Sequence, residues 1–252
     1  MENSCVLGWG TVGRATAKAF GISKYYSRSD SNITLDEASQ CKYIFVCLPT
    51  NVKDGKYETE DIEIICDLVG SEDNIIILRS TVYPGFSSFL SREYGLNVVF
   101  NPEFLSEDTA ENDALNPDLV VIGSDDPKLS REVKGLYTAR FKHVEPLVTD
   151  SITAEFIKIG LNGFFTTKVV FANEIFDYAQ MVGANYEVFK KIVERHRWGS
   201  KNHFDIYHKN GRGAGGKCLK KDMEALHYYS GRSFFSIVKN INKLLLEETG
   251  KK

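Results

Sequence analysis

The ten residues Ser4–Gly13, SCVLGWGTVG, decide the fold. Their apolar start predicts a short strand, and the GxGxxG turn that follows opens onto a helix. Gly8 permits the tight bend, Gly10 lets the backbone approach a pyrophosphate, and Gly13 lets strand and helix pack closely. Because a helix N-terminus attracts phosphate, this context favours a dinucleotide site over a glycine-rich turn without a ligand. The residues predicted to bind it are Gly8, Trp9, Gly10, Thr11, Val12 and Gly13.

Outward from this turn, short apolar runs alternate with helical patterns as far as Thr149. Such alternation predicts an α/β fold, with a mostly parallel, doubly wound Rossmann-type sheet over residues 1–149. The expected strands are Ser4–Leu7, Lys24–Ser27, Tyr43–Leu48, Asn74–Leu78, Asn97–Phe100, Leu119–Gly123 and a short run near Val144. The expected helices are Thr11–Phe20, Leu35–Gln40, Glu60–Val69 and Phe86–Tyr94.

The pattern changes after Thr149, where apolar residues recur at helical spacing, so residues 150–252 are expected to form an all-helical domain. The N-cap candidates for its first helix are Thr149, Asp150 and Ser151, and Gly183 is a C-cap candidate. The apolar positions exceed what one small domain can bury, which predicts a homodimer. The alternative is that the last helix packs back on its own domain. The expected helices are Ser151–Val182, Asn185–Arg195, Asp222–Tyr229 and Phe234–Glu248.

Composition and charge exclude several classes of function. The 252 residues are 26% charged and 42% hydrophobic, and the net charge of −3 offers no basic field for nucleic acid or an anionic membrane surface. The sequence suggests neither a bilayer-spanning apolar run of ~20 residues nor a signal peptide. Five cysteines without a CxxC pair argue against disulfides and against a metal site. A cytoplasmic protein without nucleic-acid or membrane partners is the expectation.

The type of dinucleotide depends on the residues after the second expected strand. An acidic side chain about 20 residues beyond the turn holds the adenosine ribose of NAD, and Asp30 is the nearest candidate. Arg28 precedes it, and an arginine at this place can hold the 2′-phosphate of NADP. Arg28 can equally be a solvated loop charge. NAD is therefore favoured and NADP stays open.

Polar segments follow three of the expected strands: Pro49-Thr50, Ser80-Thr81 and Asn101-Pro102-Glu103. In an open parallel sheet, ligands bind outside the carboxyl ends of the strands. Thr81 and Glu103 are therefore expected to project into the cofactor cleft. The alternative for Ser80-Thr81 is simple helix capping.

Gly211–Asp222 reads GRGAGGKCLKKD and places Cys218 near the start of an expected helix. The helix dipole and the neighbouring lysines are expected to favour the reactive thiolate. Asp222 lies one turn further on the same face, where it could position or deprotonate a water. A surface cysteine beside a basic patch is the alternative, but glycine surroundings offer little apolar packing to explain it.

The long expected helix carries a third group, because Glu155, Lys158 and Asn162 share one of its faces. A lysine and an asparagine on one face can hold a developing alkoxide or a water. On spacing alone, however, an exposed Glu–Lys pair is the favoured interpretation.

Segments throughout the chain together resemble the UDP-glucose/GDP-mannose dehydrogenase family. They are GWGTVG, FVCLPT, RSTVYPG, NPEFLSEDTA, PDLVVIG, TAEFIKIGLNGFF and GRGAGGKCLKKD, running from Gly8 to Asp222. The resemblance implies oxidation of C6 of a nucleotide sugar, with UDP-glucose expected, from alcohol to acid with two NAD in succession. It also implies a helical domain that carries the catalytic cysteine and the dimer interface.

The resemblance assigns roles to the matching residues. Cys218 would trap an aldehyde as a thiohemiacetal that becomes a thioester, Lys158 would stabilise the oxyanion, and Asp222 with a water would be the general base. The implied catalytic set is Cys218, Lys158, Asp222, Glu103, Thr81 and Asn162. Cofactor contacts are expected from the glycine turn and from Asp30, Pro49, Thr50 and Thr81. Substrate contacts are expected from Glu103, Phe104, Leu105, Lys158, Asn162, Arg197, His203 and Lys221.

The chain also departs from the family pattern. Ala214 replaces the aromatic residue of the usual GFGG, Lys220 replaces a proline, and the second strand is not followed by a clean family aspartate. Longer members carry a C-terminal α/β domain that this chain is expected to lack. The segment 199–211 and a second subunit, whose Arg197 would reach the substrate, are the expected replacements. A β-hydroxyacid dehydrogenase, or an NAD-binding subunit that needs a partner chain, are the alternatives.

Overall fold

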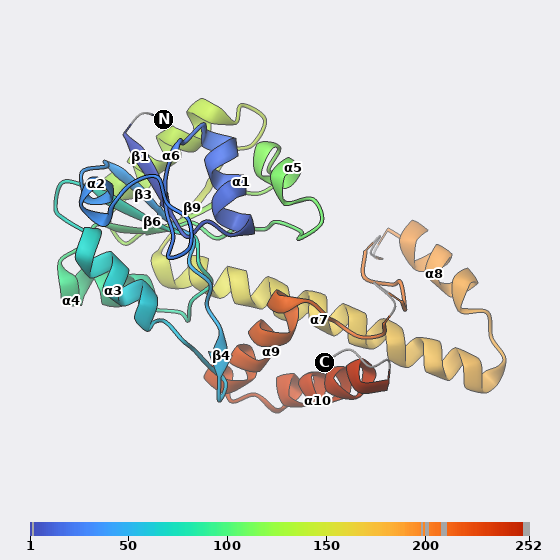
Figure 1. Cartoon of the computed structure of the whole chain (residues 1–252). Helices are drawn as coiled ribbons and strands as arrows, with labels where there is room; N and C mark the ends of the chain where they lie inside the picture. Colours follow the sequence, from blue (N-terminus) through green and yellow to red (C-terminus); the bar gives the residue numbers. More distant parts are fainter. Residues whose placement is uncertain (2, 198, 200–201, 208–210, 249–252) are drawn as a thin grey trace. The chain divides into compact units, whose positions relative to one another are not determined.

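The computed structural model describes residues 1, 3–197, 199, 202–207 and 211–248. The chain forms two compact units, which Figure 1 colours along the sequence. We call them the sheet unit (Met1–Asn51 and Tyr57–Lys158) and the helical unit (Val52–Lys56 and Ile159–Lys252). The division falls inside one long helix, α7 (Ser151–Val182), so a domain boundary at residue 149 stays a prediction.

The sheet unit contains a seven-stranded sheet with the order β2-β1-β3-β6-β7-β8-β9. Neighbouring strands are parallel except β7 and β8, where Phe100 pairs with Gly123 in antiparallel register. The strands are β1 Ser4–Leu7, β2 Lys24–Tyr26, β3 Tyr43–Val46, β6 Ile75–Leu78, β7 Val98–Phe100, β8 Val121–Gly123 and β9 Leu147–Thr149. The predicted α/β fold with a mostly parallel Rossmann-type sheet is confirmed.

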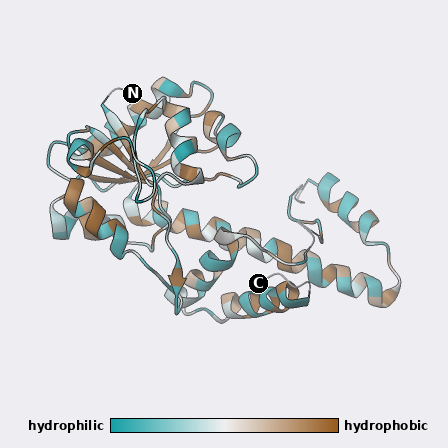
Figure 2. Cartoon of the chain, viewed as in Figure 1, coloured by the Kyte–Doolittle hydropathy of each residue, from teal (hydrophilic) through white to brown (hydrophobic). Residues whose placement is uncertain are grey.

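Helices cover both faces of this sheet because its central strands are apolar on both sides. Ile76 and Leu78 of β6 pack with α2, α3 and α4, whereas Ile75 and Ile77 pack with α1, α5 and α6. Figure 2 shows these strands in the brown of hydrophobic residues. The helices are α1 Thr11–Phe20, α2 Leu35–Ser39, α3 Glu60–Val69, α4 Phe86–Tyr94, α5 Ala110–Leu115 and α6 Pro127–Arg140.

Two of these helices, α5 and α6, were not predicted. α6 begins where the Asp126 carboxylate accepts the N–H of Lys128 at 2.7 Å, with Pro127 at the first helical position. This cap and proline are an ordinary helix-start signal, but the polar sequence that follows conceals the helix. The last strand is Leu147–Thr149, and Val144 packs instead against the core from the segment before it.

The described part of the helical unit comprises α7 from Ile159 onward, α8 (Tyr186–Arg195), α9 (Lys217–Ser230) and α10 (Ser233–Glu248). At the start of α7 the Asp150 carboxylate accepts the N–H of Thr153 at 2.8 Å, as an N-cap does. At its end Gly183 has φ +69, the left-handed conformation of a C-cap glycine. Both capping predictions are therefore confirmed.

A small hairpin that was not predicted, β4 (Val52–Lys53) with β5 (Lys56–Tyr57), packs its first strand against α9. Gly55 turns it with φ +82, and a Cβ there would stand 2.7 Å from Tyr228 Cβ. Two-residue strands give too little periodicity to be recognised from sequence.

No helix within the described ranges has the length and apolar character needed to span a bilayer. The same residues hold no group of three or more His, Cys, Asp or Glu side chains arranged to bind a metal ion.

Candidate active site

The glycine turn at the end of β1 is held by backbone packing. Gly8 donates its N–H to Tyr26 O at 2.9 Å and has φ +98, and a Cβ on it would stand 2.5 Å from Cys47 O. A Cβ on Gly13 would stand 1.9 Å from Gly8 O. These two positions therefore require glycine for the fold itself, because strand and helix leave no room for a side chain.

The turn fits the pyrophosphate of a dinucleotide. No described atom lies within 4 Å of the place where a Cβ on Gly10 would stand, so the second glycine of the motif faces open space. Gly10 is also the N-cap of α1, and no described side chain caps this helix. The first N–H groups of α1 are thus left for a ligand, and the helix dipole favours an anion there.

The second residue of the turn stacks on β2. The ring of Trp9 lies 3.8 Å from that of Tyr25 with an interplanar angle of 10°, and Arg14 donates from Nε to Trp9 O at 3.0 Å. The predicted ribose ligand, Asp30, accepts a hydrogen bond from the Tyr25 hydroxyl at 3.1 Å. Its role in binding a cofactor stays a prediction.

The loops after β3 and β6 are tied together. Thr50 donates from Oγ1 to Thr81 O at 2.8 Å, and Ser80 donates from Oγ to Leu48 O at 2.7 Å. Thr50, Ser80 and Thr81 are all buried. The alternative interpretation of Ser80-Thr81 as a helix cap is wrong, because α4 begins only at Phe86.

Glu103 and Lys158 form a buried ion pair. Lys158 Nζ lies 2.9 Å from Glu103 Oε1 and donates to Glu103 O at 2.7 Å, while Leu105 donates its N–H to Glu103 Oε2 at 2.8 Å. Phe104 places its ring 5.6 Å from the ammonium. Burial opposes ionisation of Glu103, but the Lys158 charge and these hydrogen bonds outweigh it, so the pKa of Glu103 is lowered.

Glu155 is not the exposed partner of Lys158 that spacing favoured. It is fully buried, and its carboxylate accepts the N–H of Gly85 at 2.5 Å and that of Ser87 at 2.8 Å. These N–H groups open α4, so the carboxylate caps one helix from another. Burial raises the pKa of Glu155, and the hydrogen bonds from Ser87 and Gly85 only partly offset this.

In the helical unit, Asp222 is fully buried near the start of α9. Its Oδ2 accepts a hydrogen bond from Asn162 Nδ2 at 2.5 Å, and its Oδ1 lies 3.1 Å from Lys221 Nζ. The close approach of α7 to α9 depends on Gly163, because a Cβ there would stand 2.4 Å from Leu226 Cδ2. The structure thus joins three of the predicted site residues into one network.

Cys218 lies in the first turn of α9, which begins five residues earlier than predicted, after Gly216 with φ +76. Its side chain is exposed, whereas the other four cysteines are buried. Burial raises the pKa of Cys47 to about 11 and that of Cys66 to about 12, so these thiols stay protonated near neutral pH. Exposure and a helix start are what a nucleophilic cysteine needs.

The glycine segment before Cys218 is anchored by side chains that sequence reasoning missed. Asn242 of α10 accepts the N–H of Ala214 at 2.7 Å and donates to Ala214 O at 3.1 Å. Arg212 donates to Asn173 Oδ1 at 3.0 Å and to Asp177 Oδ2 at 2.6 Å, and its Nη1 reaches Glu248. The sequence offered only a polar Asn242 within the apolar pattern of α10, and its burial became visible in the structure.

The remaining predicted substrate residues follow α8. Arg197 comes two residues after the end of that helix. His203 has φ +74, and its ring stacks on Phe165 of α7 with 4.9 Å between centroids. Burial and the Lys168 charge lower the pKa of His203. Residues 200–201 and 208–210 of the loop expected to cover the substrate lie outside the described residues.

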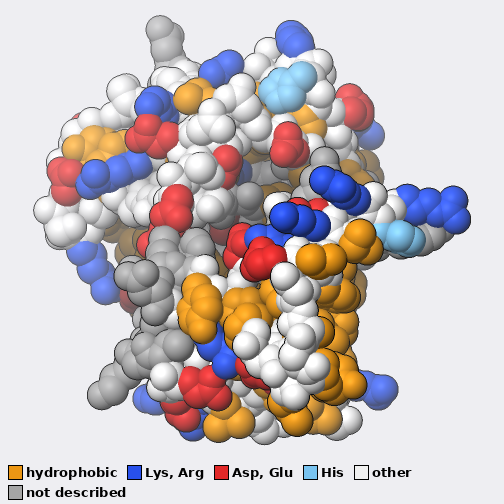
Figure 3. All heavy atoms as spheres, turned by 90° about the vertical axis from the view of Figure 1, so that its right-hand side faces the viewer, with side chains coloured by type: hydrophobic (Ala, Val, Ile, Leu, Met, Phe, Trp, Pro, Cys, Tyr) orange, Lys and Arg blue, Asp and Glu red, His pale blue; other side chains and the backbone are white. Residues whose placement is uncertain are grey.

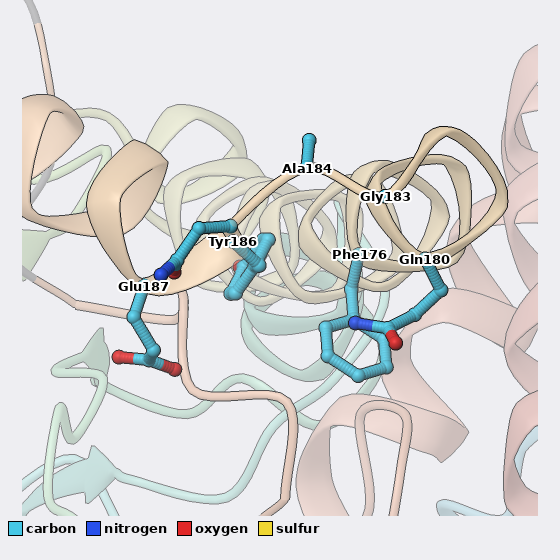
Figure 4. Close-up of a pocket in the computed structure, with 7 residues that line it drawn as sticks. Phe176, Gln180, Gly183, Ala184, Tyr186 and Glu187 are labelled. Atoms are coloured by element: carbon cyan, nitrogen blue, oxygen red, sulfur yellow. The ribbon is translucent and has the colours of Figure 1, made fainter.

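The structure also holds a pocket of about 340 Å³ at the turn between α7 and α8 (Figure 4). Phe176 and Gln180 line it from α7, and Tyr186 and Glu187 from α8. The pocket residues lie outside the set of predicted site residues.

A doubly wound sheet whose first glycine turn is open to phosphate defines a dinucleotide-binding protein of Rossmann type. The chain belongs to the UDP-glucose/GDP-mannose dehydrogenase family. The family's NAD binding domain matches residues 22–141 and its central domain matches residues 152–243. The glycine turn precedes both matches, so its geometry supports dinucleotide binding independently.

Individual relatives match most of the chain. The UDP-glucose 6-dehydrogenase of Rickettsia conorii is 33% identical over 207 residues, which are 78% of this chain and 46% of the relative. The GDP-mannose 6-dehydrogenase of Azotobacter vinelandii is 32% identical over 230 residues, 83% of this chain and 51% of the relative. The chain thus spans about half the length of these curated relatives.

Among solved structures, a UDP-glucose dehydrogenase from Pyrobaculum islandicum has the same fold, with a TM-score of 0.82 at 23% identity. The similarity covers 99% of this chain and 72% of the other. The family's NAD binding domain and the dehydrogenase relatives support a nicotinamide cofactor.

Proposed function

We propose that the chain is a nucleotide-sugar 6-dehydrogenase, which oxidises C6 of a UDP-sugar from alcohol to carboxylate and most simply converts UDP-glucose to UDP-glucuronate. The observation that carries the proposal is the exposed Cys218 in the first turn of α9, one turn before the buried Asp222. Relatives named for UDP-glucose and GDP-mannose support the substrate class.

The reaction consists of two oxidations separated by a covalent step. The C6 alcohol loses a hydride and a proton to give an aldehyde, and the Cys218 thiolate adds to the aldehyde to give a thiohemiacetal. Loss of a second hydride and a proton gives a thioester, which water cleaves to the carboxylate and the thiol. The bound nicotinamide dinucleotide supplies the acceptor of each hydride, so two are reduced per sugar.

Lys158 supplies positive charge where an oxyanion develops. Its ammonium is fixed by Glu103 Oε1 and Glu103 O, so it needs no reorganisation when negative charge appears. Glu103, kept ionised by its lowered pKa, holds Lys158 and with Thr81 assists the water that cleaves the thioester. Mutation of either member of the pair therefore affects both chemistry and stability.

Asp222 acts as the general base for water, and Asn162 positions its carboxylate. The hydrogen bond from Asn162 Nδ2 leaves the second oxygen beside Lys221, so the carboxylate has one fixed orientation. Asn162 and Lys221 contribute to substrate positioning, as do Phe104, Leu105 and His203. A base held in one orientation, one helical turn from the nucleophile, suits hydrolysis of a thioester on Cys218.

We also propose that the protein is a homodimer in the cytoplasm, with Arg197 acting across the interface. Phe164, Phe171 and Tyr178 recur every seven residues on α7 and are each at least half exposed. α10 also exposes apolar side chains, and hydrophobic residues gather in the lower half of Figure 3. Contiguous exposed apolar surface of this kind marks a protein interface. A reducing compartment suits the buried thiols.

The dimer is tested by light scattering of the wild type and of Phe171→Glu. A dimer that becomes a monomer in the variant supports the interface. Ile64→Glu is the matched control, because Ile64 is an equally exposed apolar residue on α3 of the sheet unit. A monomeric wild type would contradict a site shared between subunits.

The activity is tested by following reduced cofactor with a panel of UDP- and GDP-sugars, supplying NAD or NADP. We expect two equivalents of reduced cofactor per sugar and no acid product with Cys218→Ala. Cys41→Ala is the control, because Cys41 is buried. Asp222→Asn is expected to accumulate the thioester, visible as a mass adduct on the intact protein. About one equivalent of reduced cofactor per sugar, or full turnover by Cys218→Ala, would contradict the proposal.

A further inference from the structure

The residues that follow β2 occupy the place where folds of this type bind the adenosine ribose of a dinucleotide. Gly8 donates its N–H to Tyr26 O at 2.9 Å, so the end of β2 lies directly beside the glycine turn. The chain then continues with Ser27, Arg28 and Ser29. Arg28 stands 20 positions after Gly8, which is the distance at which such sheets carry the residue that binds the ribose.

Asp30 takes part in the hydrogen bonds that hold the turn after β2. Its backbone carbonyl accepts both the N–H of Ser27 at 3.0 Å and the Ser27 hydroxyl at 2.7 Å, which closes a tight turn with Arg28 and Ser29 at the tip. The Asp30 carboxylate is bound to the Tyr25 hydroxyl. The only carboxylate of this turn is therefore used to fix the turn itself.

The chain after Asp30 runs along the outer edge of β2. Tyr25 donates its N–H to Asn32 Oδ1 at 2.8 Å and accepts the N–H of Asn32 at 3.1 Å. β1 pairs with the opposite edge of β2, with Leu7 in register with Tyr26. Asn32 thus lies on the side of β2 away from β1, whereas Ser27 follows Tyr26, whose carbonyl binds Gly8 on the side next to β1.

The chemistry of the tip is that of a phosphate site. NAD selection relies on a carboxylate that accepts hydrogen bonds from the ribose hydroxyls and repels a phosphate. This turn instead presents the guanidinium fork of Arg28, which matches phosphate oxygens, with Ser29 beside it. The Ser27 hydroxyl donates to Asp30 O at 2.7 Å and accepts the Asp30 N–H at 3.1 Å, so it holds the turn in shape. The Arg28 side chain is 83% exposed and so is accessible to a ligand.

We propose that Arg28 and Ser29, at the tip of the turn that Ser27 closes, form a subsite for the 2′-phosphate of the adenosine ribose, and that the chain takes NADP in preference to NAD. The proposal rests on the dinucleotide site of the proposed function and departs from the NAD binding domain for which the family is named. Under it, Asp30 shapes the turn and does not contact the ribose.

One competing contact must be replaced when a phosphate binds. Arg28 Nη2 lies 2.7 Å from Asp61 Oδ1, in the first turn of α3. Both side chains are more than half exposed, and such pairs contribute little to stability. A phosphate carries more charge than the carboxylate and offers more acceptor oxygens. Asp61 therefore competes with the phosphate for Arg28, which lowers the affinity for phosphate without preventing its binding.

Calorimetry with adenosine 2′,5′-bisphosphate and adenosine 5′-monophosphate tests the subsite, because the two ligands differ only in the 2′-phosphate. Charge-assisted hydrogen bonds of this kind correspond to roughly tenfold to hundredfold in affinity. We expect the bisphosphate to bind to the full chain at least about tenfold more tightly than the monophosphate. We expect NADPH to bind more tightly than NADH by a similar factor. Quenching of tryptophan fluorescence, to which Trp9 of the glycine turn contributes, gives a second readout of binding.

Variants assign the effect to the turn. Arg28→Ala is expected to remove most of the preference for the bisphosphate while changing the affinity for the monophosphate little. Asp61→Asn is expected to increase the preference for the bisphosphate. Ser27→Asp is expected to reverse the preference, so that NADH binds more tightly than NADPH. Arg92→Ala, another exposed arginine paired with a carboxylate, is the matched control and leaves both affinities unchanged.

Three results would overturn the inference: equal or tighter binding of the monophosphate, an equal loss for both ligands in Arg28→Ala, or a selective loss for the monophosphate in Asp30→Asn. Any of them leaves the dinucleotide site of the proposed function standing. Failure of both ligands and of both reduced cofactors to bind would instead remove the dinucleotide site, and the proposed function with it.

Discussion

The two glycine-rich segments of the chain, Gly8–Gly13 and Gly211–Gly216, each lead into a helix whose start is suited to chemistry, but they are held in different ways. The first is fixed by its own strand and helix, with Gly8 against Cys47 O and Gly13 against Gly8 O. The second is fixed by side chains from distant helices, above all by Asn242 on Ala214.

This difference shows what fixes the geometry of each glycine-rich segment. The turn of the sheet unit is specified within ten residues and the strands beside it, so its glycines are required by contacts with backbone. The segment before Cys218 is shaped by α7 and α10, which contribute Asp177 to Arg212 and Asn242 to Ala214. Its geometry can therefore be changed from far away without touching the cysteine.

The largest effect is expected for Gly13→Ala. A Cβ at this position would stand 1.9 Å from Gly8 O, which is backbone and can move only with β1. We expect a loss of about 5 kcal/mol or more in the free energy of unfolding, because steric clashes with backbone are among the few changes that reach such values. We also expect loss of dinucleotide binding. Urea denaturation and calorimetry with NADPH measure the two quantities.

Gly10→Ala is the control for this substitution. No described atom approaches the position of its Cβ, so stability is expected to stay within about 1 kcal/mol while dinucleotide affinity falls. Equal stability of the two alanine variants would mean that the turn is not fixed by packing of its backbone.

The next effect in size is expected for Glu103→Gln, which leaves the buried Lys158 charge without its partner. Breaking a buried pair costs about 3–5 kcal/mol. Because the folded-state pKa of Glu103 is lowered, the pair stabilises the fold fully above the ordinary pKa of a glutamate and loses this effect as pH falls through the folded value. The free energy of unfolding, measured from neutral to acid pH, should therefore depend less on pH in the variant than in the wild type.

Glu72→Gln, at an exposed glutamate of the same unit, is the control and should change stability by less than about 0.5 kcal/mol. An acid dependence that is the same in Glu103→Gln as in the wild type would show that the pair does not contribute to it.

The same contrast explains what could be predicted from the sequence. The glycine turn, the sheet and α7 follow from local signals, such as GxGxxG after an apolar strand and Asp150 before a long apolar period. Glu155 was misjudged because spacing along a helix does not show that the N-terminus of α4 packs over it. The pairing of Lys158 with Glu103, 55 residues apart, likewise depends on the tertiary fold.

The anchors of the second segment lay beyond sequence reasoning for a related reason. Asn242 and Asn173 are ordinary polar residues in helical patterns, and nothing near them in the chain marks their partners. The glycine-rich helix start and the resemblance to a family both pointed to Cys218 and Asp222, but only the structure shows that Asp222 is buried and bound by Asn162. Long-range polar contacts are the part of a site that periodicity cannot reveal.

A smaller effect is expected for Asn242→Ala, which removes both hydrogen bonds to Ala214. Leaving a buried N–H and a buried carbonyl without their partners costs about 2 kcal/mol. Because these bonds fix the glycine segment, the rate of Cys218 alkylation by iodoacetamide should also change. Asn240→Ala, at an exposed position of the same helix, should alter neither quantity. Unchanged alkylation in Asn242→Ala would show that α10 does not position the cysteine.

The smallest effect is expected for Gly216→Ala, which tests the last residue before α9. Gly216 has φ +76, and no described atom lies within 4 Å of the site of its Cβ, so the cost is one of backbone conformation alone. With ψ 174, Gly216 adopts a backbone conformation that is essentially restricted to glycine, where a side chain costs at least about 1 kcal/mol. Gly215→Ala is the matched control, since its Cβ would make an ordinary contact of 3.8 Å with Leu246.

Thermal unfolding measures the stability of both alanine variants, and iodoacetamide alkylation measures the thiol. For each variant, the change in alkylation rate is divided by the loss of stability. If the start of α9 sets the reactivity of Cys218, this ratio is larger for Gly216→Ala than for Asn242→Ala, because Gly216 lies two residues from Cys218. If instead the anchoring helices set it, the order is reversed. The ratio of the two measurements therefore decides whether the cysteine is tuned locally, like the glycine turn of the sheet unit, or from a distance.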